Sequence, residues 1–265
     1  MNSSEVVDSG LNSPTLEALL TAIARLKTGI ESLPPQEAVD YYHLLTAISV
    51  RFVPDLYEAY DACVASILAT EKKKVTCSRS CSACCSHYVS SVEPFELIAL
   101  DLHLKKRENY ADLILASYNR TVTYEKILKA EASEEKPGAV AEEADDRALY
   151  RYFLRGRSCP YLEKDGSCGV YEWRPMACRM FFAESSPRFC AGKALASPWN
   201  RNFQVELPDV AEQALARCSR LLEGLELPEE LFPGIVAVNG LFGRYEGPPG
   251  REVPSDSNGP EVSLP

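Results

Sequence analysis

The sequence lacks the segments that would place it in or across a membrane. No run of about 18 uncharged apolar residues occurs in the chain. The first residues, Met1 to Glu5, have neither the basic nor the apolar region of a secretory signal. We therefore expect no membrane association and a cytoplasmic location.

Several enzyme motifs are also missing. The sequence contains no H-E-x-x-H, no G-x-S-x-G and no Gly-rich phosphate loop. The net charge of −10 argues against a nucleic-acid partner, because binding a phosphate backbone normally requires a basic surface. The charge is uneven, however: residues 151–201 hold nine basic and four acidic side chains, a local charge of +5.

Cysteine, in contrast, is abundant and clustered. Of the ten cysteines, eight fall in two segments, Cys77 to Cys85 and Cys159 to Cys190. In a reducing cytosol such a pattern favours metal binding or redox chemistry over structural disulfides. Thiolates suit zinc and iron–sulfur clusters and exclude calcium and magnesium, which need oxygen ligands. The sequence therefore predicts a zinc or iron–sulfur centre.

The first cluster reads C-x3-C-x2-C-C. In a regular helix these four positions would span about 12 Å along the axis, at about 1.5 Å per residue. Four thiolates around one zinc ion must lie within about 4 Å of each other, given bonds of about 2.3 Å. Either the segment is an irregular loop, or its cysteines divide among sites that the second cluster completes. The adjacent Cys84 and Cys85 favour division, since neighbouring side chains point in different directions. His87 is a weaker candidate ligand.

The second cluster is predicted to be loops rather than helix. Asp165-Gly166 is a tight-turn signal that would fold Cys159 back toward Cys168, and Arg174-Pro175 forms a second turn before Cys178. Arg174 and Arg179 are predicted to offset thiolate charge and to donate hydrogen bonds to sulfur. The predicted metal ligands are Cys77, Cys81, Cys84, Cys85, Cys159, Cys168, Cys178 and Cys190.

Helical periodicity dominates outside the clusters. Helices are predicted over about 13–29, 35–48, 56–68, 94–104, 110–130, 142–154 and 208–223, with Pro54 ending or kinking the second stretch. Cys63 and Cys218 are predicted to pack in the core. The fold class is mainly α, with helices packed around an irregular cysteine-rich metal-binding core. The predicted segments are a disordered 1–12, helical 13–76, cysteine-rich 77–190, helical 191–246 and a disordered tail 247–265.

The cysteine pattern resembles the YkgJ or C-x-x-C-x-x-C-C family of zinc- or iron-chelating proteins. The resemblance is carried by the first cluster, then Cys159-Pro160, Gly166-x-Cys168, Arg174-Pro175-x-x-Cys178-Arg179 and Cys190. It covers about 77–190 and implies metal chelation without a settled reaction. Flagellin lysine N-methylase has related cysteine patterns, so protein methylation is a candidate function by analogy alone.

Three functions remain open at this stage. An iron–sulfur protein would use the arginines to tune a redox potential, and we favour iron–sulfur over zinc. A structural zinc module would present the helices to an unknown protein partner. The spacing of Cys77, Cys81 and Cys84 also matches radical S-adenosylmethionine enzymes, but Ala83 replaces their usual aromatic residue and no alternating strand–helix pattern is present. No catalytic residue is assigned.

Overall fold

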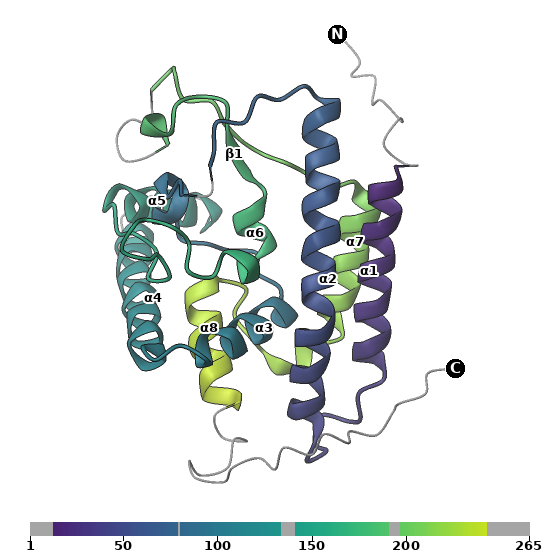
Figure 1. Cartoon of the computed structure of the whole chain (residues 1–265). Helices are drawn as coiled ribbons and strands as arrows, with labels where there is room; N and C mark the ends of the chain where they lie inside the picture. The colour runs from purple at the N-terminus through teal and green to yellow at the C-terminus, as the bar shows by residue number, and fades with distance from the viewer. Residues whose placement is uncertain (1–12, 79, 134–140, 191–196, 243–265) are drawn as a thin grey trace.

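A computed structural model describes residues 13–78, 80–133, 141–190 and 197–242. These residues form eight α-helices and a two-stranded sheet, so the predicted mainly helical fold is confirmed (Figure 1). The helices are α1 (Pro14–Glu31), α2 (Tyr41–Thr70), α3 (Pro94–Lys105), α4 (Tyr110–Ser133), α5 (Ala141–Leu154), α6 (Met176–Arg179), α7 (Asp209–Arg220) and α8 (Leu231–Phe242). None of the described helices is both long and apolar enough to cross a membrane.

Helices α1, α2 and α7 lie side by side along one side of the molecule (Figure 1). Ser13 is the N-cap of α1 and Pro14 its first residue, as the sequence predicts. Leu19, Ile23 and Leu26 recur at helical spacing and are fully or almost fully buried. Burying a leucine or isoleucine side chain contributes about 1.5–3 kcal/mol. This apolar stripe therefore holds α1 against its two neighbours.

Helix α2 continues through Pro54, so the proline does not end it, and the two helices predicted over 35–48 and 56–68 are one. A proline inside a helix removes one backbone hydrogen bond and clashes with the preceding turn. The surrounding residues compensate for that cost, because Val53, Leu56 and Tyr57 are all buried. Packing thus overrides the local helix-breaking signal, and α2 runs without a break to Thr70, before the first cysteine cluster.

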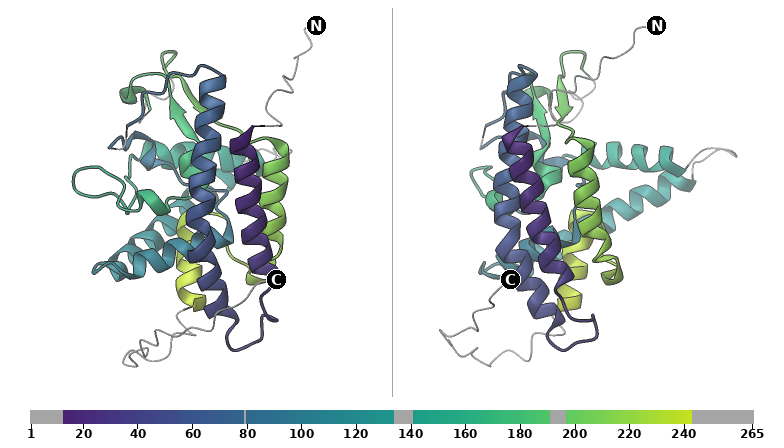
Figure 2. Two further views of the ribbon diagram at one scale, coloured as in Figure 1. Left: turned by 45° about the vertical axis from the view of Figure 1, so that its right-hand side comes forward. Right: turned by 90° about the vertical axis from the view of Figure 1, so that its right-hand side faces the viewer.

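Helices α3, α4, α5 and α8 form the other side of the molecule. Helices α4 and α5 make a hairpin that projects from the remaining helices (Figure 2). The buried carboxylate of Glu131 on α4 holds this hairpin together through ion pairs with Arg147 and Arg151 on α5. Residues 134–140, between α4 and α5, lie outside the described residues. Helix α8 lies within the predicted helical segment 191–246.

Between the two groups of helices lie the two segments that carry the clustered cysteines, residues 77–85 and 159–190, which are mostly loop. The only sheet within the described residues pairs β1 (Phe181–Ala183) with β2 (Asn202–Gln204) in antiparallel fashion. Cys63 on α2 and Cys218 on α7 are buried in the helical core, as predicted. The predicted disorder at 1–12 and 247–265 lies outside the described residues.

Candidate metal centre

The first cysteine cluster folds as a series of tight turns between α2 and α3. A single turn of 3-10 helix, η2 (Ala83–Ser86), is its only helical element in the described part of the loop. Backbone hydrogen bonds from Cys81 N to Ser78 O and from Cys85 N to Ser82 O, 2.9 and 3.0 Å long, close the turns. The segment is therefore an irregular loop, one of the two outcomes expected from the spacing.

The second cluster begins with a short hairpin. Gly166 lies at its tip with φ of +82°, a conformation that glycine adopts without strain. Leu162 and Cys168 face each other as an antiparallel bridge, and Gly169 N donates to Tyr161 O at 2.8 Å. The predicted turn at Asp165-Gly166 is thus confirmed, and it brings the two flanking cysteines to the same side of the molecule.

The two clusters are joined directly through the backbone. Cys159 N donates to Cys85 O at 2.7 Å. A second junction lies at the start of the first cluster, where Thr76 N donates to Ala183 O of β1 at 2.8 Å. These hydrogen bonds link residues more than seventy positions apart. They place the loop of the first cluster between the hairpin and the sheet.

Cys178 sits in α6, a single helical turn that two buried side chains hold in place. Met176 N at the start of α6 donates to Oε1 of Glu96 on α3 at 2.7 Å. Arg179 at its end is 4% exposed and donates to the carbonyl of Arg174 at 2.8 Å and to Asp61 on α2 at 2.5 Å. The position of Cys178 is therefore fixed from α2 and α3.

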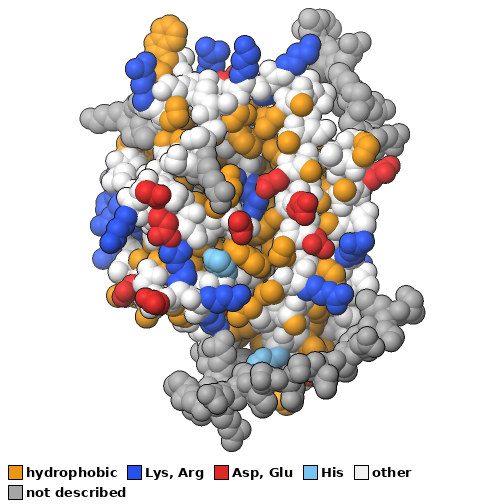
Figure 3. Space-filling view, in the orientation of Figure 1, with side chains coloured by type: hydrophobic (Ala, Val, Ile, Leu, Met, Phe, Trp, Pro, Cys, Tyr) orange, Lys and Arg blue, Asp and Glu red, His pale blue; other side chains and the backbone are white. Residues whose placement is uncertain are grey.

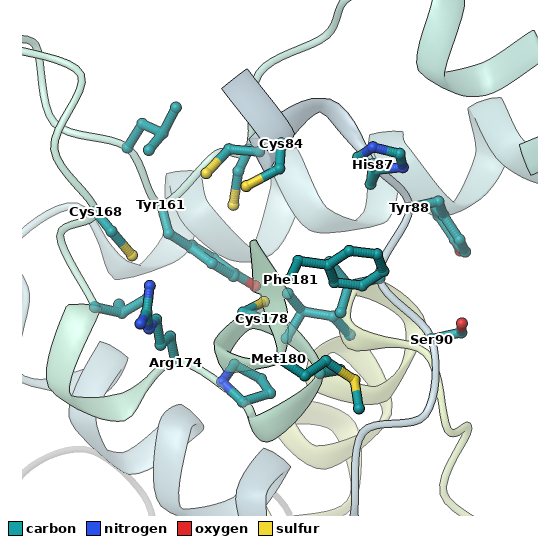
Figure 4. A pocket seen from close by; sticks show the side chains of 18 of the residues that line it. Cys84, His87, Tyr88, Ser90, Tyr161, Cys168, Arg174, Cys178, Met180 and Phe181 are labelled. Atoms are coloured by element: carbon teal, nitrogen blue, oxygen red, sulfur yellow. The ribbon is translucent and has the colours of Figure 1, made fainter. Parts of the chain in front are cut away.

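Thiols from both clusters surround one cavity of about 400 Å³ (Figure 4). Its cysteine side is formed by the η2 loop, the hairpin and α6. Its other side is formed by aromatic and apolar residues of α5, β1, α8 and the segment after η2. The cysteines that line the cavity are Cys81, Cys84, Cys85, Cys159, Cys168 and Cys178.

Cys77 and Cys190 lie near the cavity without lining it. The Sγ of Cys190 is buried and donates to Oδ1 of Asn202 at 3.2 Å. Burial raises its pKa, and the neighbouring thiols of Cys77, Cys81 and Cys84 raise it further.

The thiols that line the cavity shift one another's pKa values. Burial raises the pKa of Cys159 to about 12 and also raises that of Cys178, and each is raised further by thiolates across the cavity. A hydrogen bond from the thiol of Cys85 lowers the pKa of Cys84 and raises that of Cys85. The positive charges of Arg174 and Arg179 act in the opposite sense on Cys168, whose pKa burial raises. A bound metal cation would relieve this mutual repulsion.

The cysteine thiols are ligands that suit zinc or iron. The distances between them show how they would bind a metal. Within the described ranges, no three His, Cys, Asp or Glu side chains already stand close enough to share one ion. All ten cysteines are free thiols. The thiols thus surround a space instead of meeting at a point, and binding a metal would draw them together.

The two arginines predicted beside the metal differ in their surroundings. Arg179 directs its guanidinium to backbone carbonyls and to Asp61, and it stacks over the ring of Tyr57 at 4.0 Å. Arg174 lines the cavity itself, with its guanidinium carbon 4.1 Å from the ring centre of Tyr171. Arg179 therefore shapes the loop that carries Cys178, whereas Arg174 faces the thiols.

Sequence reasoning missed two groups near the centre. Glu96 is completely buried on α3, and nothing in its helical pattern marks it as a support for α6. The aromatic side of the cavity gathers His87, Phe153 and Phe181, whose rings are close to parallel. They come from three segments far apart in the chain, so no spacing rule could have connected them.

Glu96 is expected to make stability depend on pH. Burial raises its pKa from 4.5 to about 7, so its neutral form is favoured in the folded protein. Its contribution to stability is complete below pH 4.5 and is lost as pH rises through about 7, a change of about 3 kcal/mol. Urea unfolding of the metal-free protein between pH 5 and 8 should show this decline. Glu96→Gln should flatten it, whereas Glu58→Gln, on the exposed side of α2, should not.

The structure is that of a mainly helical protein in which thiols from several loops line one cavity. Residues 76–197, a little under half of the chain, match the family model CxxCxxCC, described as “Putative zinc- or iron-chelating domain”. The matched region contains all eight clustered cysteines and excludes Cys63 and Cys218. The chain thus carries a metal-binding domain of the zinc- or iron-chelating kind. No curated protein and no solved structure matches the chain.

Proposed function

We propose that the chain binds iron as an iron–sulfur cluster in the cysteine-lined cavity. The observation that carries this proposal is the spread of the thiols. Six cysteines border about 400 Å³, yet no three metal-binding side chains in the described residues are close enough for one ion. A cluster of several iron and sulfide atoms holds its cysteines further apart than a single zinc ion does. The cavity therefore suits a cluster better than one zinc ion.

The eight cysteines divide into two sets of four in this proposal. Cys77 and Cys190 do not line the cavity, and their thiols interact with those of Cys81 and Cys84, which do. Assigning Cys81 and Cys84 to the set of Cys77 and Cys190 leaves four of the six cavity thiols for the cluster. The adjacent Cys84 and Cys85 would then serve different metal positions. The cluster ligands are Cys85, Cys159, Cys168 and Cys178.

We further propose that the cluster is redox-active. Residues 151–201 carry a local charge of +5 around the second cysteine cluster, and Lys and Arg side chains gather along the upper edge of the face shown in Figure 3. Positive charge near a cluster stabilises the added electron and raises the reduction potential. Electron transfer in the cytoplasm, with a protein as the partner, is the role that this supports.

Anaerobic purification tests the proposal. The full chain should contain iron and acid-labile sulfide in equal amounts, and its visible absorption should bleach with dithionite. A colourless protein with stoichiometric zinc and no sulfide would overturn the proposal and support the zinc module instead. A protein without either metal would contradict both.

A further inference from the structure

The cavity extends well beyond its thiols. On the side away from the hairpin it is bordered by aromatic and apolar side chains of four separate segments (Figure 4). His87 stacks on Phe153 with ring centres 4.1 Å apart, and its ring is within 17° of parallel to that of Phe181. The remaining large members of this aromatic wall are Tyr88, Tyr150, Met180, Leu231 and Phe232.

The aromatic wall cannot be explained as metal ligation. Apart from His87, it offers no thiol, imidazole or carboxylate, which are the usual ligands of zinc. A metal held by the thiols would fill only the cysteine side of the cavity. Cavities of about 300–1,000 Å³ that are mostly apolar, with a few convergent polar groups, are typical of small-molecule sites. The aromatic side is therefore free to receive an organic molecule.

Arg174 supplies the polar group of this site. Its Nε is buried, and no hydrogen-bond partner for it exists among the residues that the structure describes. A buried donor without a partner costs roughly 1–3 kcal/mol, so a ligand that satisfies it gains affinity. Arg174 also lies near the thiols of Cys84, Cys168 and Cys178. An anionic group bound to Arg174 would thus stand beside the metal.

The mouth of the cavity also suits a ligand that enters from solvent. Phe181 on β1 is 39% exposed and Tyr150 on α5 is 45% exposed, although both line the cavity. Both rings therefore border the cavity as well as the solvent.

We propose that the cavity binds an aromatic organic anion of small-molecule size, with its ring against the aromatic wall and its acidic group at Arg174, beside the metal. The inference rests on the proposed function in one respect: it assumes that a metal centre fills the cysteine side of the cavity. The metal centre would then act on, or respond to, a bound molecule instead of serving as a structural staple.

Two fluorescent probes of similar shape test this on the metal-loaded full chain. Anilinonaphthalene sulfonate carries an acidic group, and phenylnaphthylamine is its neutral counterpart. One molecule of the anionic probe should bind per chain. Arg174→Gln should weaken the anionic probe about tenfold and the neutral probe by less than about twofold, because only the former bonds to a charged donor.

A matched pair of variants on one strand separates the cavity from the general surface. Neighbouring residues of a strand point to opposite faces. Phe181 lines the cavity, whereas Phe182 packs against Phe203 instead. Phe181→Ala should weaken both probes about fivefold, the range expected for a lost aromatic contact, and Phe182→Ala should not.

The outcomes distinguish this inference from the proposed function. Metal and sulfide are measured in each sample, so loss of the cluster appears separately from loss of probe binding. The inference is overturned if several probes bind per chain, if Phe182→Ala weakens binding as much as Phe181→Ala, or if neither Phe181→Ala nor Arg174→Gln has an effect. A metal-free wild-type protein that still binds one probe would contradict the proposed function alone.

Discussion

Replacement of Cys85 by serine is expected to remove at least about half of the bound iron and labile sulfide, together with the matching visible absorption. Cys85 lines the cavity, and its backbone carbonyl accepts the hydrogen bond from Cys159 that joins the two clusters. Serine keeps this backbone contact but offers a poor ligand for iron, which prefers thiolate in such clusters. Metal analysis and the absorption spectrum of anaerobically purified protein measure the loss.

Cys63→Ala provides the control for this experiment. Cys63 is buried in α2 among helical core residues, so its removal should leave iron and sulfide unchanged. Cys77→Ser should lower metal content while the cavity cluster persists, because Cys77 belongs to the other set of four thiols, with Cys81, Cys84 and Cys190. Full metal content and an unchanged spectrum in Cys85→Ser would refute the proposed cluster ligands.

Substitution of Arg179 by methionine is expected to destabilise the metal-free protein by about 3 kcal/mol. The guanidinium donates to the carbonyls of Arg174 and Glu172, both at 2.8 Å, and pairs with Asp61. Methionine fills much of the same volume but leaves the two carbonyls without their donor. The loop carrying Cys178 would then lose its anchor, and urea unfolding measures the change in free energy.

Two further variants show whether the burial of Arg179 is the cause of the expected loss of stability. Arg188→Met removes an exposed arginine from the same basic stretch and should cost less than about 0.5 kcal/mol. Asp61→Asn should cost less than about 1 kcal/mol, because Asp61 is half exposed and its ion pair is screened by solvent. If all three variants unfold at the same urea concentration, Arg179 has no anchoring role.

The helices could largely be predicted from the sequence because their signals are local. Pro94 opens α3 and Pro14 opens α1, as capping preferences require. Pro54 shows the limit of such signals. Its cost to α2 is offset by tertiary burial of neighbouring side chains, which no local window contains. The span of α2 therefore depended on packing partners elsewhere in the chain.

The candidate site, too, could be predicted only where its signals are local. The turn at Gly166 and the two cysteine segments were recognisable because each is a short motif. The sequence could not show that Cys159 bonds to the backbone of Cys85, since that contact depends on how the loops meet. Glu96 and the aromatic wall were missed for a related reason. A buried carboxylate on a helix and single aromatic residues in separate segments have no spacing that marks them.

The anchoring of Arg179 to Asp61 bears on how this metal-binding segment could be inherited or transplanted. Asp61 and Tyr57 lie on α2, before the first residue of the family match, and Leu231 and Phe232 lie on α8, after its last. A gene fragment encoding 76–197 alone would carry every clustered cysteine and Glu96, but it would lack the α2 partners of Arg179 and the α8 side of the cavity wall. Recombination that moves this segment would have to bring α2 and α8 with it, or find a host whose helices replace them.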